Sequence, residues 1–159
     1  MALNITNSQD TLVYIAPAGT DLSDATKIAA AVALAKQIGC IQTLGSVDTS
    51  REVTEYSCLS SSEIAKSLGS VKAGSLDVSL LFDALDAEGQ LELRTMYAAN
   101  ERREFIIQLT DNGTVNPTYI TFEGAVSALA MPIEKDAAVL QNFTVELTSL
   151  PVTTLASDT

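Results

Sequence analysis

The sequence predicts a mainly β chain of the α+β class, with more strand than helix. Two patterns predict it: apolar and polar residues alternate along several segments, as on the two faces of a strand, and Asp86–Asn100 has strong helical spacing. The chain has 159 residues, which is most simply one domain covering 1–159. Hydrophobic residues make up 47% but aromatic residues only 5%, so the core is expected to be aliphatic.

The first third of the chain predicts a strand, a helix and a further extended piece. Thr11–Ala16 (TLVYIA) is rich in β-forming residues and ends at Pro17. Asp21–Gln37 is rich in Ala and Leu, which favours a helix that stops at Gly39. Ile41–Leu44 can begin another strand. The candidates for the N-cap of this helix are Asp21, Ser23 and Asp24.

The most informative segment is a long strand pair that opens into a polar loop. Arg51–Leu59 (REVTEYSCL) forms the first predicted arm, and Ala73–Ala84 (AGSLDVSLLFDA) forms the second. The second arm alternates cleanly, with one set of side chains apolar and the other polar. These sets are Leu76, Val78, Leu80 and Phe82 against Ser75, Asp77 and Ser79. The segment 60–72 is predicted to be the loop.

A loop as long as 60–72 is uncommon inside a compact domain and is usually functional or disordered. Its apolar residues Ile64, Leu68 and Val71 would be poorly sheltered on a monomer, which favours a partner surface. A short surface helix, Glu63–Leu68, folded back on its own domain fits the spacing equally well. The sequence leaves both interpretations open.

The second half begins with the predicted helix Asp86–Asn100, whose apolar positions are three or four residues apart. Acidic residues in its early turns suit the helix dipole. A strand follows in the segment RREFIIQLTDNG, where Phe105, Ile107 and Leu109 alternate with polar residues. The Asp-Asn-Gly triplet at its end indicates a turn.

Two more strands are predicted before the C-terminus. Tyr119–Met131 is a long extended stretch rich in Gly and Ala, which leaves room for a close backbone or layer. In the last strand Phe143, Val145 and Leu147 alternate with polar residues, and Pro151 closes it. The two ends, 1–10 and 150–159, are expected to be mobile arms.

Composition argues against catalysis and nucleic-acid binding. Twenty acidic residues against nine basic ones give a net charge of −11, which repels phosphates. The absence of His removes Ser-His-Asp and Cys-His arrangements and all His-bearing metal sites. A Ser62–Lys66 pair is interpreted as ordinary surface, and the acidic residues between 83 and 89 do not match a calcium loop. No enzyme, cofactor or metal is predicted.

Cys40 and Cys58 are interpreted as reduced, partly buried residues of a cytoplasmic fold, although the sequence leaves a bond between them open. The N-terminal MALNITNSQD has no basic region or hydrophobic run, so no targeting segment is expected. The most apolar stretch, Ile28–Ala35, is far shorter than the roughly 20 residues that span a bilayer, so no membrane partner is expected.

The order of these elements resembles the tail tube proteins, or major tail proteins, of long-tailed, non-contractile bacteriophages. The resemblance runs from TLVYIAPAG through IGCIQTLGSVDTSREVTEYSCLSSSE, AGSLDVSLLFD, the helix EGQLELRTMYAANERR and FIIQLTDNG to the last segment, which ends in VELTSLP. In that segment an F-x-G-x-V-S element precedes a turn and a final strand. The matching residues are Phe122, Gly124, Val126 and Ser127.

The resemblance implies a β-sandwich or open barrel with one flanking helix. It also implies that six copies form a ring, that rings stack into a tube, and that neighbouring copies join their sheets around a lumen. The loop and the terminal arms would contact the adjacent ring. The residues expected to stack rings are Ser60, Ser61, Ser62, Glu63, Ile64, Lys66 and Leu68.

A lumen lined by acidic and hydroxyl residues would repel DNA over about 8 Å in physiological salt, so that DNA passes without specific binding. The lumen candidates are Asp77, Ser79, Thr121 and Glu123. The other implied partners are a tape measure protein in the lumen and the tail terminator and distal tail proteins. The implied location is the virion tail, assembled in the host bacterial cytoplasm.

Three other functions remain as alternatives. An inner tube protein of a contractile injection device or type VI secretion system shares the fold and would need an outer face that binds a sheath. A small ligand-binding β-barrel would be a monomer with a closed apolar cavity. A hydrolase that uses carboxylates would have a cleft with strongly shifted acid pKa values.

Overall fold

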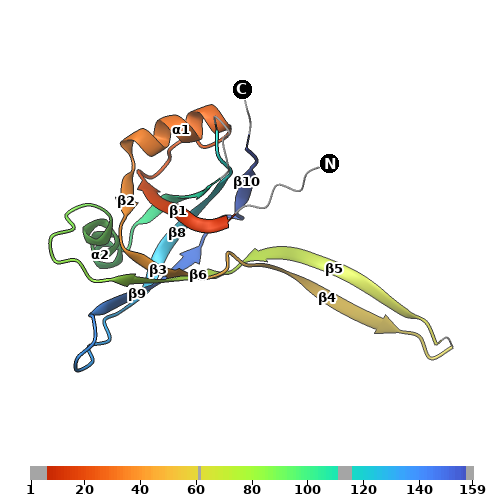
Figure 1. Cartoon of the computed structure of the whole chain (residues 1–159). Coiled ribbons are helices and arrows are strands. Elements are labelled where there is room, and N and C mark those ends of the chain that lie inside the picture. Colours follow the sequence, from red (N-terminus) through yellow and green to blue (C-terminus); the bar gives the residue numbers. More distant parts are fainter. Residues whose placement is uncertain (1–6, 61, 111–115, 157–159) are drawn as a thin grey trace.

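The computed structural model describes residues 7–60, 62–110 and 116–156, and it divides the chain into a body and a projecting ribbon (Figure 1). Helices α1 and α2 and most strands belong to the body, while β4 and β5 form the ribbon. The body elements are β1 (Asn7–Ala16), α1 (Ala25–Leu34), β2 (Lys36–Ile38), β3 (Ile41–Leu44), β6 (Ser75–Leu81), α2 (Gly89–Ala99), β7 (Arg102–Thr110), β8 (Tyr119–Ala130), β9 (Leu140–Leu147) and β10 (Val152–Thr154). The ribbon strands are β4 (Thr49–Ser57) and β5 (Ile64–Ala73).

Within the described residues, eight strands form one antiparallel sheet in the order β2-β1-β7-β8-β9-β6-β3. The short strand β10 pairs with the first part of β8, beside the end of β9. The sheet stays open, with β2 and β3 as its outer strands. The mainly β class and the open form of the sheet are therefore confirmed, and the structure has both helices that the sequence pattern predicts, where the resemblance implied one flanking helix.

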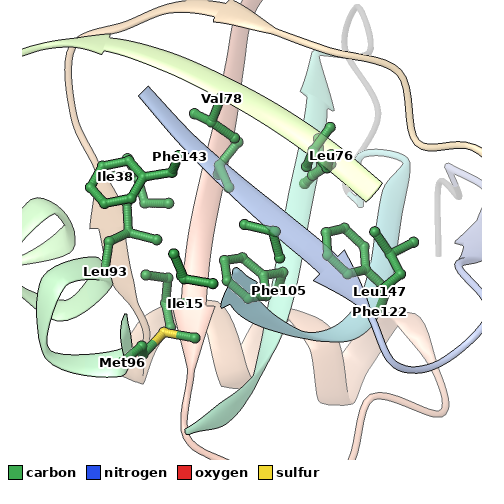
Figure 2. Packing of buried hydrophobic residues seen from close by; sticks show 14 of the residues in the cluster. Ile15, Ile38, Leu76, Val78, Leu93, Met96, Phe105, Phe122, Phe143 and Leu147 are labelled. Carbon is green, nitrogen blue, oxygen red and sulfur yellow. The ribbon is translucent and has the colours of Figure 1, made fainter. Parts of the chain in front are cut away.

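The sheet curls around a single large core, which its inner face shares with α2 (Figure 2). Phe105 of β7 and Phe122 of β8 stack with their ring centroids 5.4 Å apart. Leu93 and Met96 of α2 are fully buried against the same core. The alternating residues of β6 and β9 point inward as expected: Leu76, Val78 and Leu80, and Phe143, Val145 and Leu147.

Helix α1 covers part of the opposite face of the sheet. Its buried residues Ile28 and Ala31 pack against Ala16, Ile106 and Tyr119, which come from β1, β7 and β8. The rest of that face, over β9, β6 and β3, has no helix above it (Figure 1). The outer face of the sheet is thus covered by α1 over β1, β7 and β8, and it is open over β9, β6 and β3.

The two helices differ in how well the sequence predicts their ends. Asp24 caps α1 by accepting a hydrogen bond from the backbone N of Lys27 (2.9 Å). The helix ends at Leu34, well before Gly39, because residues 36–38 leave it to pair with β1 as β2. For α2 the prediction is confirmed within a few residues, and Asn100 ends the helix in the left-handed conformation (φ 54°).

The prediction of a loop at 60–72 is wrong, because most of it is strand β5, which pairs with β4. The predicted second arm, as β6, pairs with β9 and β3 instead of with the first arm. Both faces of β5 meet solvent, and Lys66 stands between Ile64 and Leu68 on its more apolar face. The alternation that identifies a half-buried strand is therefore weak there.

Two smaller expectations are also corrected. The segment 150–159 is not wholly a mobile arm, because Val152–Thr154 form β10 on the sheet, and residues 7–10 at the other end belong to β1. Residues 1–6 and 157–159 lie outside the described residues. Cys40 and Cys58 are free, as expected, but both are exposed and not partly buried.

Candidate assembly surfaces

The first surface is the ribbon of β4 and β5, which projects from the body (Figure 1). Its strands are roughly 30 Å long at the usual rise per residue. Every residue of β4 and all but the last of β5 are exposed. A two-stranded hairpin alone is marginally stable in water, so a ribbon of this length is expected to be covered by another chain.

The two faces of the ribbon differ in polarity. Register and alternation place Val53, Ile64, Leu68 and Val71 on one face, which we call the apolar ribbon face. Their side chains are between 36% and 64% exposed. The other face has Tyr56 as its large apolar residue and is otherwise small or polar. Each face also carries one ion pair, Lys66–Glu55 (2.9 Å) or Lys72–Glu52 (3.7 Å).

The base of the ribbon is held in the sheet by backbone contacts at two glycines. The N–H of Gly45 donates to Asp77 (2.8 Å) and that of Gly74 to Asp48 (2.9 Å), both at backbone carbonyls. A Cβ on either glycine would lie 3.0 Å from the accepting oxygen, closer than ordinary contact. Since Gly74 alone separates β5 from β6, the ribbon is the outer half of one long hairpin whose inner half is β3 and β6.

The predicted stacking residues lie on and around this ribbon. Ile64, Lys66 and Leu68 are on β5, and register places all three on the apolar ribbon face. Ser60, Ser62 and Glu63 belong to the turn that joins β4 to β5, and Ser61 lies outside the described residues. Sequence reasoning missed Val53, the cross-strand partner of Leu68, because β4 was paired with the wrong segment.

The second surface is the uncovered outer face of the sheet over β6 and β9. Asp77 and Ser79 lie opposite Thr144 and Asn142, and Thr144 donates a hydrogen bond from Oγ1 to Asp77 Oδ1 (2.8 Å). A hollow of about 450 Å³ lies on this face, and Thr43 of β3 also lines it. Thr144 and Asn142 were not among the predicted site residues, although their alternation with buried residues of the last strand places them on the polar face.

The other two lumen candidates lie on the same face of the sheet, on β8. Thr121 and Glu123 flank Phe122, which points into the core, so their side chains point away from it. Thr121 is only 5% exposed, and its hydroxyl donates to the carbonyl oxygen of Val152 (3.5 Å). Thr121 is thus buried in the monomer, beside its register partner Val152 of β10, and contributes almost nothing to the open polar face. Glu123 is half-buried.

Two of the strand edges that the sheet leaves free within the described residues border the polar outer face. Strand β7 pairs with β8 only as far as Ala125, so one edge of 126–130 has no partner strand. Strand β3 forms the outer edge at the other side of β6. The four strands between these two edges, β8, β9, β6 and β3, carry the polar outer face. Unpaired edges of this kind can accept a strand from another chain.

Several solved structures share this arrangement of helices and strands. The chain superposes on a chain of the SPP1 tail tube, solved by solid-state NMR and cryo-EM, with a TM-score of 0.67 and 14% identity over 97% of this chain and 81% of that one. A chain of the PVC sheath/tube terminator of an extracellular contractile injection system gives 0.70 and 12% over 96% and 99%. A chain of the tail of an empty gene transfer agent particle gives 0.66 and 13% over 94% and 99%.

The chain has the tail-tube fold. Each of these matches covers at least 94% of the chain, which is more than the body alone, so the ribbon is part of the tail-tube fold and not an addition to it. No protein-family sequence model matches the chain, and no curated protein matches it in sequence.

Metal ligation and membrane spanning by a helix have no counterpart in the described residues. The ranges 7–60, 62–110 and 116–156 contain no group of three or more acidic or Cys side chains placed to hold a metal ion. Neither α1 nor α2 is long and apolar enough to cross a membrane.

Proposed function

We propose that the chain is a structural tube subunit that self-assembles into stacked hexameric rings, forming a phage tail tube through which DNA is ejected into the host. The observation that carries the proposal is the exposed, amphipathic ribbon in a chain with the tail-tube fold. Its apolar face needs a cover that the chain itself does not provide. Sixfold symmetry supports the ring size, since the gene transfer agent tail has C6 symmetry and the baseplate of the anti-feeding prophage is sixfold symmetrised.

The apolar ribbon face is proposed to bind the next copy in the ring or the adjacent ring. Covering Val53, Ile64, Leu68 and Val71 removes four large side chains from water, each worth on the order of 1 kcal/mol or more when fully buried. Multiplied over a ring of copies, this is enough to hold an assembly that one contact could not. Ser60, Ser62 and Glu63 in the turn extend the same contact.

The polar sheet face is proposed to line the lumen. Asp77 and Ser79 are at its centre, with Glu123 toward its margin, and the acidic residues repel the phosphates of passing DNA. The free edges of 126–130 and of β3 would pair between neighbouring copies, so that four strands per copy close into one barrel. In this arrangement the two edges that border the polar face are both paired, while β2 keeps its free outer edge.

The proposal has consequences for partners and location. A tail terminator, distal tail proteins and a tape measure protein in the lumen are the expected partners, and the location is the virion tail after assembly in the host cytoplasm. The role is structural and not enzymatic. A ligand-binding barrel is disfavoured, because the sheet of the described residues is open and its interior is filled by the aliphatic and aromatic core.

The second candidate is the inner tube of a contractile injection device. It is favoured by the likeness to chains of the PVC and anti-feeding prophage structures, whose TM-scores are as high as that of the SPP1 tail tube. The two candidates share ring assembly and differ at the outer surface, where a contractile device must bind a sheath. Co-assembly with a sheath protein encoded beside this chain separates them.

Electron microscopy of the concentrated chain tests the proposal, with a matched pair of ribbon variants. The wild-type chain is expected to form hollow tubes or sixfold rings. V53S/L68S removes a cross-strand pair from the apolar ribbon face and is expected to abolish them. T54A/S67A changes the adjacent cross-strand pair on the opposite face and is expected to leave them intact. Tubes formed equally by both variants would exclude the assembly role of this face.

A further inference from the structure

Two glutamates lie directly opposite each other on neighbouring strands of the body. Glu104 on β7 is the register partner of Glu123 on β8. Their side chains point to the same face of the sheet, where directly opposed Cβ atoms are about 4.5–5.5 Å apart. Like charges in this position repel each other and weaken the structure around them.

Glu123 holds the corner that leads from β9 into β10. Its carboxylate Oε1 accepts a hydrogen bond from the Thr148 hydroxyl (2.7 Å), and its backbone N donates to Ser149 Oγ (2.8 Å). Its carbonyl oxygen accepts from the backbone N of Thr148 (2.8 Å) and of Ser149 (3.3 Å). One residue therefore carries four hydrogen bonds that dock the segment from which β10 starts.

Glu104 is half-buried in a hollow of about 270 Å³ between this corner and the segment 20–23. Its carboxyl group has no hydrogen bond or ion pair within the described residues. Burial raises the pKa of its carboxyl, and the Glu123 carboxylate raises that pKa further. On β1 its register partner is the uncharged Ala16, and the lining residues of the corner and of β10 are Ser149, Leu150 and Val152.

The remaining charged groups near Glu104 do not neutralise it. Arg102 lies two residues away on the same face of β7, and the ion pairs of the described residues do not include one between it and Glu104. At the start of α1, Lys27 is paired with Asp21 (2.7 Å), and Asp24 is occupied as the helix cap. Glu123 is therefore the titratable group that faces Glu104 directly. The only other lining side chains with polar groups in the hollow are the hydroxyls of Thr20, Ser23, Thr121 and Ser149.

We propose that the Glu104–Glu123 pair is a pH-sensitive latch on the C-terminal segment Thr148–Thr154. When Glu104 is protonated, the repulsion disappears and Glu123 holds the corner tightly. When Glu104 is ionised, the two charges repel, and the corner and β10 open more often. This inference goes beyond the proposed function, because the latch acts within one chain whether or not the chain assembles.

The direction of the pH effect follows from the raised pKa of the Glu104 carboxyl. A carboxyl whose pKa is raised on folding stabilises the folded state most when the pH is below its ordinary value near 4.3. That stabilisation is lost as the pH rises through the raised pKa. The segment is therefore docked more firmly in mild acid and less firmly at neutral pH.

Amide hydrogen exchange of the dilute, unassembled chain tests the latch between about pH 4 and pH 7.5, which brackets glutamate titration. Rates are corrected for the intrinsic pH dependence of exchange, and amides of β6 and β9 in the core serve as the internal reference. Opening of Thr148–Thr154 is expected to rise on the order of two- to fivefold toward neutral pH, as for opposed like charges. Core amides are expected to show no such rise.

Three matched variants test whether Glu104 and Glu123 cause the pH response. Glu104→Gln is expected to keep the segment protected at every pH and to remove the pH response. Glu123→Gln keeps an acceptor oxygen for Thr148, and this variant is also expected to remove the pH response. Glu146→Gln, which removes an exposed carboxylate from the same face without touching the corner, is expected to leave the response unchanged. A pH response that persists in Glu104→Gln, or is absent from the wild-type chain, would overturn the latch.

Discussion

The ribbon and the body are both built from antiparallel strands, yet they differ in what covers those strands. Strand β5 runs almost directly into β6, with Gly74 alone between them. β6 buries Leu76, Val78 and Leu80 in the core, whereas nine of the ten residues of β5 are exposed. Both regions therefore have paired strands, but only the strands of the body bury apolar side chains in a core. The buried core thus lies in the body, and the ribbon adds almost no buried surface to it, as expected if the ribbon binds a partner.

Charge divides the two regions in the same way. Between 49 and 73 the three basic residues balance three acidic ones, so the ribbon is neutral and the rest of the chain carries the whole net charge of −11. A neutral ribbon with an apolar face can approach a second negatively charged body without long-range repulsion. The basic residues are Arg51, Lys66 and Lys72, and the acidic ones are Glu52, Glu55 and Glu63.

Phe143→Ala in the body gives the largest expected loss of stability. Phe143 is 1% exposed at the centre of the core, and its removal leaves a cavity that the surrounding strands cannot fill. The free energy of unfolding is expected to fall by about 3–5 kcal/mol. Urea unfolding followed by circular dichroism measures it, with Phe143→Leu as the milder control. A loss below about 1 kcal/mol would contradict a close-packed core at this position.

Glu92→Gln tests the body's buried ion-pair network and is expected to have the next largest effect. The Glu92 carboxylate bridges Lys36 of β2 (2.9 Å) and Arg103 of β7 (2.9 Å), and its side chain is only 12% exposed. Removing the charge is expected to cost about 2 kcal/mol, as for hydrogen bonds between charged groups. Urea unfolding measures this change as well.

The matched control for Glu92 is Glu55→Gln in the ribbon. Glu55 also pairs with a lysine at 2.9 Å, but both side chains are more than half exposed, so the change is expected to cost less than about 0.5 kcal/mol. Equal losses of unfolding free energy for the two variants would mean that solvent exposure does not set the strength of ion pairs in the body and in the ribbon.

Prediction from sequence succeeds where one face of an element is buried. The alternation in β6 and β9 and the helical spacing of α2 reflect contacts with the core, and all three elements are confirmed. It fails where the deciding contact is remote in sequence. Residues 36–38 look helical but pair with β1, and 152–154 look like a tail but pair with β8. No local pattern contains those partners.

The candidate site shows the same limit. Alternation correctly places Asp77 and Ser79 on the polar face of β6. It places Thr121 on the outer face of β8 too, but it cannot tell that this position is buried in the folded chain. The ribbon was missed for the converse reason: with no core on either side, Ile64, Lys66 and Leu68 share a face that only the register with β4 reveals.

V53S/L68S in the ribbon is expected to have a small effect on stability, well below those of Phe143→Ala and Glu92→Gln, although the same variant is expected to abolish assembly. Both side chains are about half exposed or more and touch no core residue, so each change is expected to cost no more than about 0.5 kcal/mol. Urea unfolding of the dilute chain measures this cost beside that of Phe143→Ala. Near-native stability together with lost tubes would show that the apolar ribbon face acts between chains. A loss of several kcal/mol would show instead that the ribbon stabilises its own body, and missing tubes would then report unfolding and not a lost contact.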